Sequence, residues 1–280
     1  MRFALTLVFW LVTTVALAVA VPAAWAQLNV VSEGGYAALA QKAADDPALQ
    51  AAAASELSTR ALALIAAHGG GRYPVDSSQV HDAATAFTAG PSFPTLFGQA
   101  SRAAHRWLFT GAGPGDSWVV DLAPMLNDSS IRQILSRHNV KVPATLTVAL
   151  TASVSSVSLR QGQLSRLTTW GPWVSIGAAA LSGFCGLLTL AVARRRGKAL
   201  TSLGVSALLV GAAGWAGIEV GGRYINNALN RTTDDIRQIA EAMVGQAEAG
   251  LHHWLNLTLI AGVALVGFGV IVAIVGSVRK

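Results

Sequence analysis

The sequence has few charged residues for its length. Asp, Glu, Lys and Arg make up 12% of its 280 residues, whereas hydrophobic residues make up 52%. Soluble globular domains usually carry about 25% charged residues. This composition therefore excludes a chain that is soluble throughout. The shortage of charge is concentrated in four long runs that contain almost no ionisable side chains.

Cysteine is also scarce, and it occurs once, as Cys185 inside one of these apolar runs. A single cysteine excludes an intramolecular disulfide, so any domain outside the membrane must be held together by its core. The sequence has no Cys or His ligands at metal-binding spacing, and no recognisable motif places a nucleophile. We therefore predict no metal site, no cofactor and no catalytic residue, in a chain that is not an enzyme.

Acidic residues are slightly outnumbered, yet the distribution of charge argues against a nucleic-acid partner. The formal net charge is +6, from 20 Lys and Arg against 14 Asp and Glu. Seven basic residues flank the apolar runs, which leaves 13 against all 14 acidic residues, a net charge of −1. Nucleic-acid binding needs basic side chains gathered against phosphates, so we predict none. The seven flanking residues are Arg2, Arg194, Arg195, Arg196, Lys198, Arg279 and Lys280.

The four apolar runs are long enough to cross a membrane as helices. About 20 residues at 1.5 Å each span a hydrocarbon core about 30 Å thick, and a helix satisfies all of its own backbone groups in lipid. We predict transmembrane helices within residues 1–26, 167–193, 199–220 and 254–278.

The basic residues predict the orientation, because cytoplasmic loops are enriched in Lys and Arg. With four crossings, Arg2, the loop 194–198 and the tail 279–280 all lie on the same face of the membrane. We therefore predict a multi-pass protein of the cell membrane with cytoplasmic N- and C-termini. Its main domain, residues 27–166, then lies outside the cytoplasm.

The first apolar run has a second interpretation as a cleaved signal peptide. Arg2 precedes the run, and Ala24-Trp25-Ala26 followed by Gln27 resembles a signal-peptidase site. The run is long for a signal sequence, however, and Trp25 suits an anchor at the membrane interface. We favour an uncleaved signal anchor; cleavage is the alternative, and it would leave three spans.

Residues 27–166 predict a small, mainly helical α+β domain. The first half is rich in alanine and has a helix-start signal at Asp46-Pro47. Two later segments, 117–122 and 144–150, have the β-branched and alternating residues of strands, and they predict a short two-stranded ribbon. The expected fold class is a mostly α membrane protein with four transmembrane helices and this α+β domain.

A second external segment, residues 221–253, predicts an amphipathic helix. Thr232-Thr-Asp-Asp235 resembles a capping box, and apolar residues follow on one helical stripe. Three interpretations stay open: packing against the external domain, lying flat on the membrane, and recognition of a lipid or protein partner. The stripe consists of Ile236, Ile239, Ala240, Met243, Val244, Ala247 and Leu251.

Four polar residues of the external domain form a candidate site. Arg102, His105 and Arg106 share one face of a predicted helix, and Asp121 is the charged residue of a predicted strand. An ion pair between Asp121 and one arginine would tie the helix to the strand. The alternative is a pocket for an anion or a lipid headgroup.

Two further features lie on the third span. Glu219 and Arg223, four residues apart at its outer end, predict an ion pair at the membrane edge. Gly211, Gly214 and Gly217 predict a close helix contact, because small residues let helices approach one another. The contact is either between spans of this chain or an interface with a second copy or another protein.

Five short motifs follow one another along the chain: Glu33-Gly-Gly-Tyr36, Asp45-Asp-Pro-Ala-Leu-Gln50, Phe93-Pro-Thr-Leu-Phe97, Ala100-Ser-Arg-Ala-Ala-His-Arg-Trp107 and Val119-Val-Asp-Leu122. In order and spacing they resemble a family of actinobacterial integral membrane proteins. The resemblance covers nearly the whole chain, although the loops of this chain are short. It implies a four-span envelope protein with an arginine-rich loop after the second span, and it implies no particular chemistry.

These observations together predict a non-catalytic protein of the cell envelope that acts as a scaffold or accessory binding factor through its external domain. The expected partners are membrane lipid and either an envelope protein or a second copy of the chain. Two alternatives stay open. A transporter or channel subunit would have a polar cavity between spans near Glu219, and a lipid-modifying enzyme would have an open cleft at His105 and Asp121.

Overall fold

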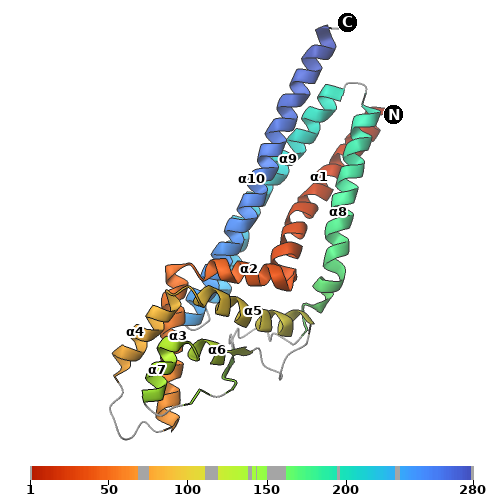
Figure 1. Cartoon of the computed structure of the whole chain (residues 1–280). Helices are drawn as coiled ribbons and strands as arrows, with labels where there is room; N and C mark the ends of the chain where they lie inside the picture. The colour runs from red at the N-terminus through yellow and green to blue at the C-terminus, as the bar shows by residue number, and fades with distance from the viewer. Residues whose placement is uncertain are drawn as a thin grey trace. The chain divides into compact units, whose positions relative to one another are not determined.

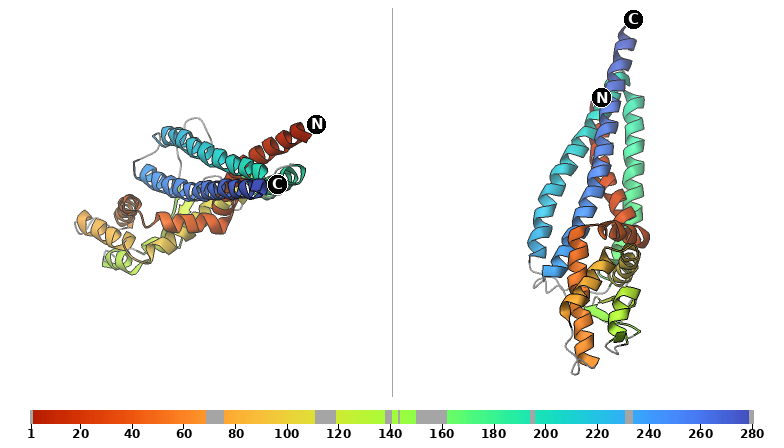
Figure 2. Two further views of the ribbon diagram at one scale, coloured as in Figure 1. Left: turned by 90° about the horizontal axis from the view of Figure 1, so that it is seen from above. Right: turned by 60° about the vertical axis from the view of Figure 1, so that its left-hand side comes forward.

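The computed structural model divides into two compact units (Figures 1 and 2). We call Met1–Val30, Thr169–Tyr224 and Glu248–Lys280 the membrane unit, and Val31–Thr168 with Ile225–Ala247 the helical unit. The residues that the structure describes are 2–68, 76–110, 119–137, 141–142, 144–149, 162–193, 196–230 and 234–278.

Four helices are long and apolar enough to cross a membrane, which confirms this part of the prediction. They are α1 (Arg2–Ala26), α8 (Ser165–Val192), α9 (Arg196–Leu229) and α10 (Asp234–Val278), as Figure 1 shows. Between 11% and 28% of each apolar stretch is buried inside the structure. Most of the apolar side chains therefore face outward, as lipid-facing side chains do. The chain thus has the helices of a multi-pass membrane protein.

Two of these helices extend beyond the predicted spans. α9 continues through Gly221 and Gly222 to Leu229, and the amphipathic segment is the first part of α10 rather than a separate helix. A glycine costs a helix about 1 kcal/mol relative to alanine, which is too little to end a helix that other residues pack against. At Gly222 there is such a neighbour: an added Cβ would lie 2.9 Å from Glu248 Oε1.

Hydrogen bonds join α1 to α9 inside the membrane unit. The hydroxyl oxygens of Thr14 and Ser206 lie 2.7 Å apart, and Trp10 Nε1 donates to the Ser202 carbonyl at 2.8 Å. Ser206 is fully buried. Polar contacts of this kind hold helices together in lipid, because burying an apolar side chain against another helix gains little when the lipid around it is equally apolar. α1 is therefore an integral part of this bundle.

The helical unit consists of short helices that begin at conventional capping residues. Asp46 Oδ1 accepts a hydrogen bond from Ala48 N at 2.8 Å, next to Pro47 as the first helical residue of α3. Asp76 accepts from Ser78 N at 3.0 Å at the start of α4. A π-helical turn, η1 (Gln27–Val31), separates α1 from these helices. They are α2 (Glu33–Ala43), α3 (Pro47–His68), α4 (Ser77–Thr88), α5 (Phe93–Thr110), α6 (Ala123–Leu126) and α7 (Ser129–Arg137).

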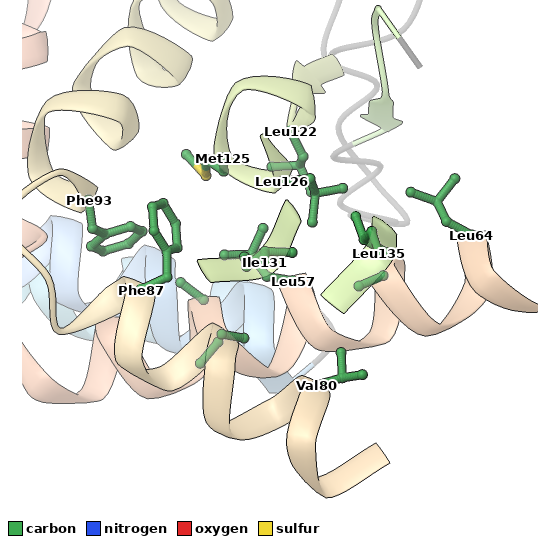
Figure 3. Packing of buried hydrophobic residues seen from close by; sticks show 14 of the residues in the cluster. Leu57, Leu64, Val80, Phe87, Phe93, Leu122, Met125, Leu126, Ile131 and Leu135 are labelled. Atoms are coloured by element: carbon green, nitrogen blue, oxygen red, sulfur yellow. The ribbon is translucent and has the colours of Figure 1, made fainter. Parts of the chain in front are cut away.

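The core of the helical unit brings together side chains from α3 to α7 (Figure 3). Phe87 of α4 meets Phe93 of α5 edge to face, with ring centroids 5.7 Å apart. Leu57 of α3, Leu126 of α6 and Leu135 of α7 are buried beside them. A continuous aliphatic and aromatic core thus replaces the disulfides that the sequence lacks.

The first part of α10 completes this core. Ile239, Ala242 and Met243 pack against it, and Ser55 Oγ of α3 donates to Asp235 Oδ2 at 2.7 Å. Of the three interpretations of the amphipathic stripe, core packing is the one that the structure contains. The two threonines of the proposed capping box, residues 232 and 233, lie outside the described residues.

The expected α+β class with a two-stranded ribbon is wrong. About 90% of the structure is helical, and the described residues form no sheet layer. The segments expected to be strands contribute a three-residue antiparallel contact, β1 (Val119–Asp121) with β2 (Thr147–Ala149). An isolated pair of such strands is marginal in water, so it cannot organise a layer, and helices provide the core. Residues 117, 118 and 150 of the expected strands lie outside the described residues.

Candidate functional site

The pairing of α2 with α5 in the helical unit contains three of the four polar residues singled out by the sequence. Ser32 caps α2, because its side chain accepts a hydrogen bond from Gly35 N. This places Glu33 in the first helical turn, where the helix dipole favours an acidic residue. Glu33 Oε1 lies 3.6 Å from Arg106 Nε of α5, with side chains 44% and 53% exposed. An ion pair this exposed contributes little stability.

His105 occupies the buried side of the same helix. It is 4% exposed, and its ring stacks on Phe109 with centroids 4.2 Å apart and planes inclined by 11°. Its other neighbour is Tyr36 of α2, with ring centroids 5.2 Å apart. Desolvation by burial raises the pKa of the Tyr36 phenol, which therefore stays neutral at physiological pH. His105 thus lies in an aromatic contact between helices and not in an open cleft.

Asp121 has a structural role at the end of β1. Its Oδ1 accepts hydrogen bonds from Ala123 N at 2.9 Å and from Leu146 N at 2.8 Å. The first bond satisfies a free amide at the start of α6. The second bond fastens the chain just before β2. The carboxylate therefore serves two backbone amides, and the structure pairs Arg106 with Glu33 instead of with Asp121.

Arg102 and Arg106 are both exposed on α5, whereas His105, which lies between them in the sequence, is buried. The four residues Arg102, His105, Arg106 and Asp121 thus do not converge on one pocket in the described part of the chain. The sequence correctly placed three of them on one helix. It carried no sign of Glu33, about 70 residues earlier, as the partner of Arg106.

The expected ion pair between Glu219 and Arg223 is not among the ion pairs of the described residues. Both side chains are exposed on α9, where surroundings that solvate a charge compete with a pair. An acidic side chain that does approach α9 is Glu248 of α10, beside Gly222. In the same helix pair, Trp215 stacks on His252 with ring centroids 3.9 Å apart.

Glycines form the contact between α9 and α10. A Cβ added at Gly204 would lie 2.7 Å from Gly262 O, and one added at Gly197 would lie 2.7 Å from Gly269 O. Real Cβ atoms essentially never come within 3.0 Å of such atoms, so these backbones touch directly. We call this contact the glycine seam. It consists of Gly197 and Gly204 of α9 and Gly262 and Gly269 of α10.

The three glycines predicted as an interface have different environments. A Cβ at Gly211 or at Gly214 would lie 2.5 Å from a side-chain atom of Leu259 or Leu255, respectively, so both glycines pack within the chain. Gly217 has nothing within 4 Å. Gly197 and Gly204 were not predicted, although the succession Gly197, Gly204 and Gly211, at intervals of seven residues, is typical of a long helix contact.

Among the described residues, no three His, Cys, Asp or Glu side chains come together as metal ligands. A groove of about 510 Å³ does open on the membrane unit between α9 and α10, near Lys198.

No family model matches the chain, and no curated protein or solved structure is significantly similar to it. The resemblance to actinobacterial membrane proteins therefore stays a prediction.

Proposed function

We propose that the chain is a non-catalytic membrane protein of the cell envelope, a scaffold or accessory factor that binds its partner through the helical unit. One observation carries the proposal: α5 buries His105 and presents Arg102 and Arg106 on its outer face. Arginine is a residue of choice for interfaces, because its planar fork donates several hydrogen bonds and also stacks on aromatic rings.

The other polar side chains of the candidate site support binding over catalysis. Asp121 is occupied by two backbone amides, and the His105 ring lies between Phe109 and Tyr36. A general acid or base must reach a substrate atom within about 3 Å. Arg102 and the weakly paired Arg106 have their side chains available to a partner at the surface.

We further propose that the helical unit lies outside the cytoplasm and that both termini lie inside it. The support is the placement of basic residues at Arg2, in the loop 194–198 and in the tail 279–280. Residues 194, 195, 279 and 280 are outside the described residues.

Cysteine labelling tests this topology. In a Cys185→Ser background, a membrane-impermeant maleimide applied to intact cells should label Gln133→Cys and should not label Lys198→Cys until the membrane is opened. Both positions are exposed in the structure. The reverse pattern would overturn the orientation.

Site-specific photo-crosslinking in native membranes tests the binding role. A photo-reactive residue introduced at Arg102 should give a crosslinked product of defined mass, and one at Arg132, an exposed arginine on α7, should not. The product is either an envelope protein or a second copy of the chain, and its mass distinguishes these. Recovery of the uncrosslinked chain alone at position 102, or equal products at both positions, would contradict binding through this face.

A further inference from the structure

The groove between α9 and α10 lies entirely in the membrane unit. Its volume of about 510 Å³ falls within the range of about 300–1,000 Å³ that is usual for small-ligand sites. It is lined by Lys198, Thr201, Ser202, Val270, Ala273 and Ile274. These residues belong to two of the four helices that are apolar enough to span a membrane. In a bilayer, the molecules that can enter such a groove from the side are lipids.

The close approach of the helix backbones explains why a furrow forms here. A Cβ at Gly269 would lie 2.6 Å from Thr201 N, and one at Gly197 would lie 2.6 Å from Ala273 N. The two backbones therefore leave no room for a side chain between them at these glycines, and the groove lies beside this contact, where Thr201 and Ala273 line it. Val270 and Ile274, which are 45% and 57% exposed, form an apolar wall beside it.

The polar end of the groove carries a positive charge, and no carboxylate of the described residues forms an ion pair with it. Neither residues 193–218 nor residues 249–280 contain Asp or Glu. Lys198 and its neighbour Arg196 are exposed, and the ion pairs of the described residues include neither. Excess positive charge at the end of an apolar groove complements a molecule with an anionic head and an apolar tail.

The hydroxyl groups of Thr201 and Ser202 donate within α9, so the charged donor that faces a ligand at this end of the groove is Lys198. Thr201 Oγ1 donates to Gly197 O at 3.0 Å, and Ser202 Oγ donates to Ala199 O at 2.8 Å. Their protons are therefore already used within α9, as is common for hydroxyl side chains in membrane helices. The lysine ammonium has three donors on a flexible stem, and it suits a phosphate group.

We propose that this groove binds an anionic glycerophospholipid, with its phosphate at Lys198 and an acyl chain against Val270, Ala273 and Ile274. The site does not depend on which side of the membrane Lys198 occupies. It is also independent of the binding role of the helical unit, so either proposal can fail without the other.

Native mass spectrometry of the purified full-length chain tests the proposal. After removal of its lipid, the protein is incubated with phosphatidylglycerol or with phosphatidylcholine of the same acyl chains. The wild-type chain should retain more phosphatidylglycerol than phosphatidylcholine. Lys198→Gln should lower that retention about fivefold, the effect of one basic residue at an anionic lipid surface. Arg223→Gln, which removes an exposed cation elsewhere on α9, is the matched control and should change nothing.

A second pair of variants tests the groove itself. Ala273→Phe fills it and should abolish retention of phosphatidylglycerol, whereas Ala264→Phe, at an exposed position of α10 outside the groove, should not. Thermal unfolding in detergent identifies variants that fold like wild type, and retention is compared among these. Equal losses in Lys198→Gln and Arg223→Gln, full retention in Ala273→Phe, or complete displacement by glycerol phosphate would each overturn the proposal.

Discussion

Alanine at Gly204 should weaken the glycine seam, whereas the same substitution at Gly217 should not. A Cβ at Gly204 would lie 2.7 Å from Gly262 O and from Val266 N, both of which are backbone atoms. A backbone cannot rotate away as a side chain can, so the two helices must separate. At Gly217 nothing lies within 4 Å of the new atom. The pair of variants therefore compares one chemical change in two environments.

The size of the effect follows from the contact distances. An ordinary Cβ contact begins near 3.4 Å, and the distance at Gly204 is 2.7 Å, so a gap of 0.7 Å must open locally. Forcing extra volume into a well-packed contact costs about 1–3 kcal/mol. The gain in helix propensity from glycine to alanine, about 1 kcal/mol, is common to both variants and cancels between them. We therefore expect Gly204→Ala to be about 1–3 kcal/mol less stable than Gly217→Ala.

Unfolding by titration with SDS in mixed micelles, followed by circular dichroism, measures this difference. The double variant Gly204→Ala with Gly262→Ala adds a second test. A Cβ at Gly262 would meet Gly204 O and Leu208 N, both at 3.0 Å, so the gap opened by one alanine also accommodates the other. The double variant should cost less than the sum of the single variants. Equal transition midpoints for Gly204→Ala and Gly217→Ala would refute the reasoning.

Three further predictions concern hydrogen bonds. Ser55→Ala removes the hydrogen bond to the Asp235 carboxylate of α10. Chemical denaturation should show an unfolding free energy lower by about 1.5–3 kcal/mol, the usual contribution of a hydrogen bond to a charged group. Asp76→Ala should lower the melting temperature at pH 7 but not at pH 2. Hydrogen bonds from the hydroxyl and the backbone amide of Ser78 hold the pKa of the Asp76 carboxyl group below its usual range. The stabilisation is therefore complete above the unfolded-state pKa of about 3.9 and disappears as the pH falls through the lower folded-state pKa. Thr14→Val should cost about 0.6 kcal/mol in SDS titration, and adding Ser206→Ala should cost little more, because the two hydroxyls bond each other.

The four long helices could be predicted because their signal is local. Each apolar run exceeds the thickness of a membrane by itself, and no tertiary information is needed to recognise it. The ends of the helices were less predictable. Gly221 and Gly222 are typical helix breakers in a sequence, but α9 continues through them to Leu229. Whether such glycines end a helix depends on what packs against them, and at Gly222 this is Glu248 on another helix.

The wrong α+β class has a related cause. Val119, Val120 and the alternating residues from 144 to 150 do favour extended backbone, and three residues of each segment are paired. Strand propensity cannot tell whether enough neighbouring strands exist to build a sheet. Here the surrounding apolar residues lie on helices, so the core formed from helices.

The sequence predicted which residues of α5 lie together in the candidate site, but not the residues of other helices that they contact. Helical spacing alone places Arg102, His105 and Arg106 together. The partners that decide their roles are Tyr36 and Glu33, and these come from α2. A single sequence contains no signal for such distant contacts. The glycine seam differs, because its repeat of seven residues is visible in the sequence of α9.

The repeat of the glycine seam also limits how α9 and α10 can move along each other. Each glycine of the seam admits the opposite backbone at one height, and the residues between Gly197 and Gly204 all carry a Cβ. A short slide would drive a Cβ against that backbone, and the next matching position is seven residues away, about 10.5 Å at 1.5 Å per residue. Piston-like displacement of one helix past the other is therefore disfavoured, and the two helices travel together when the bundle rearranges.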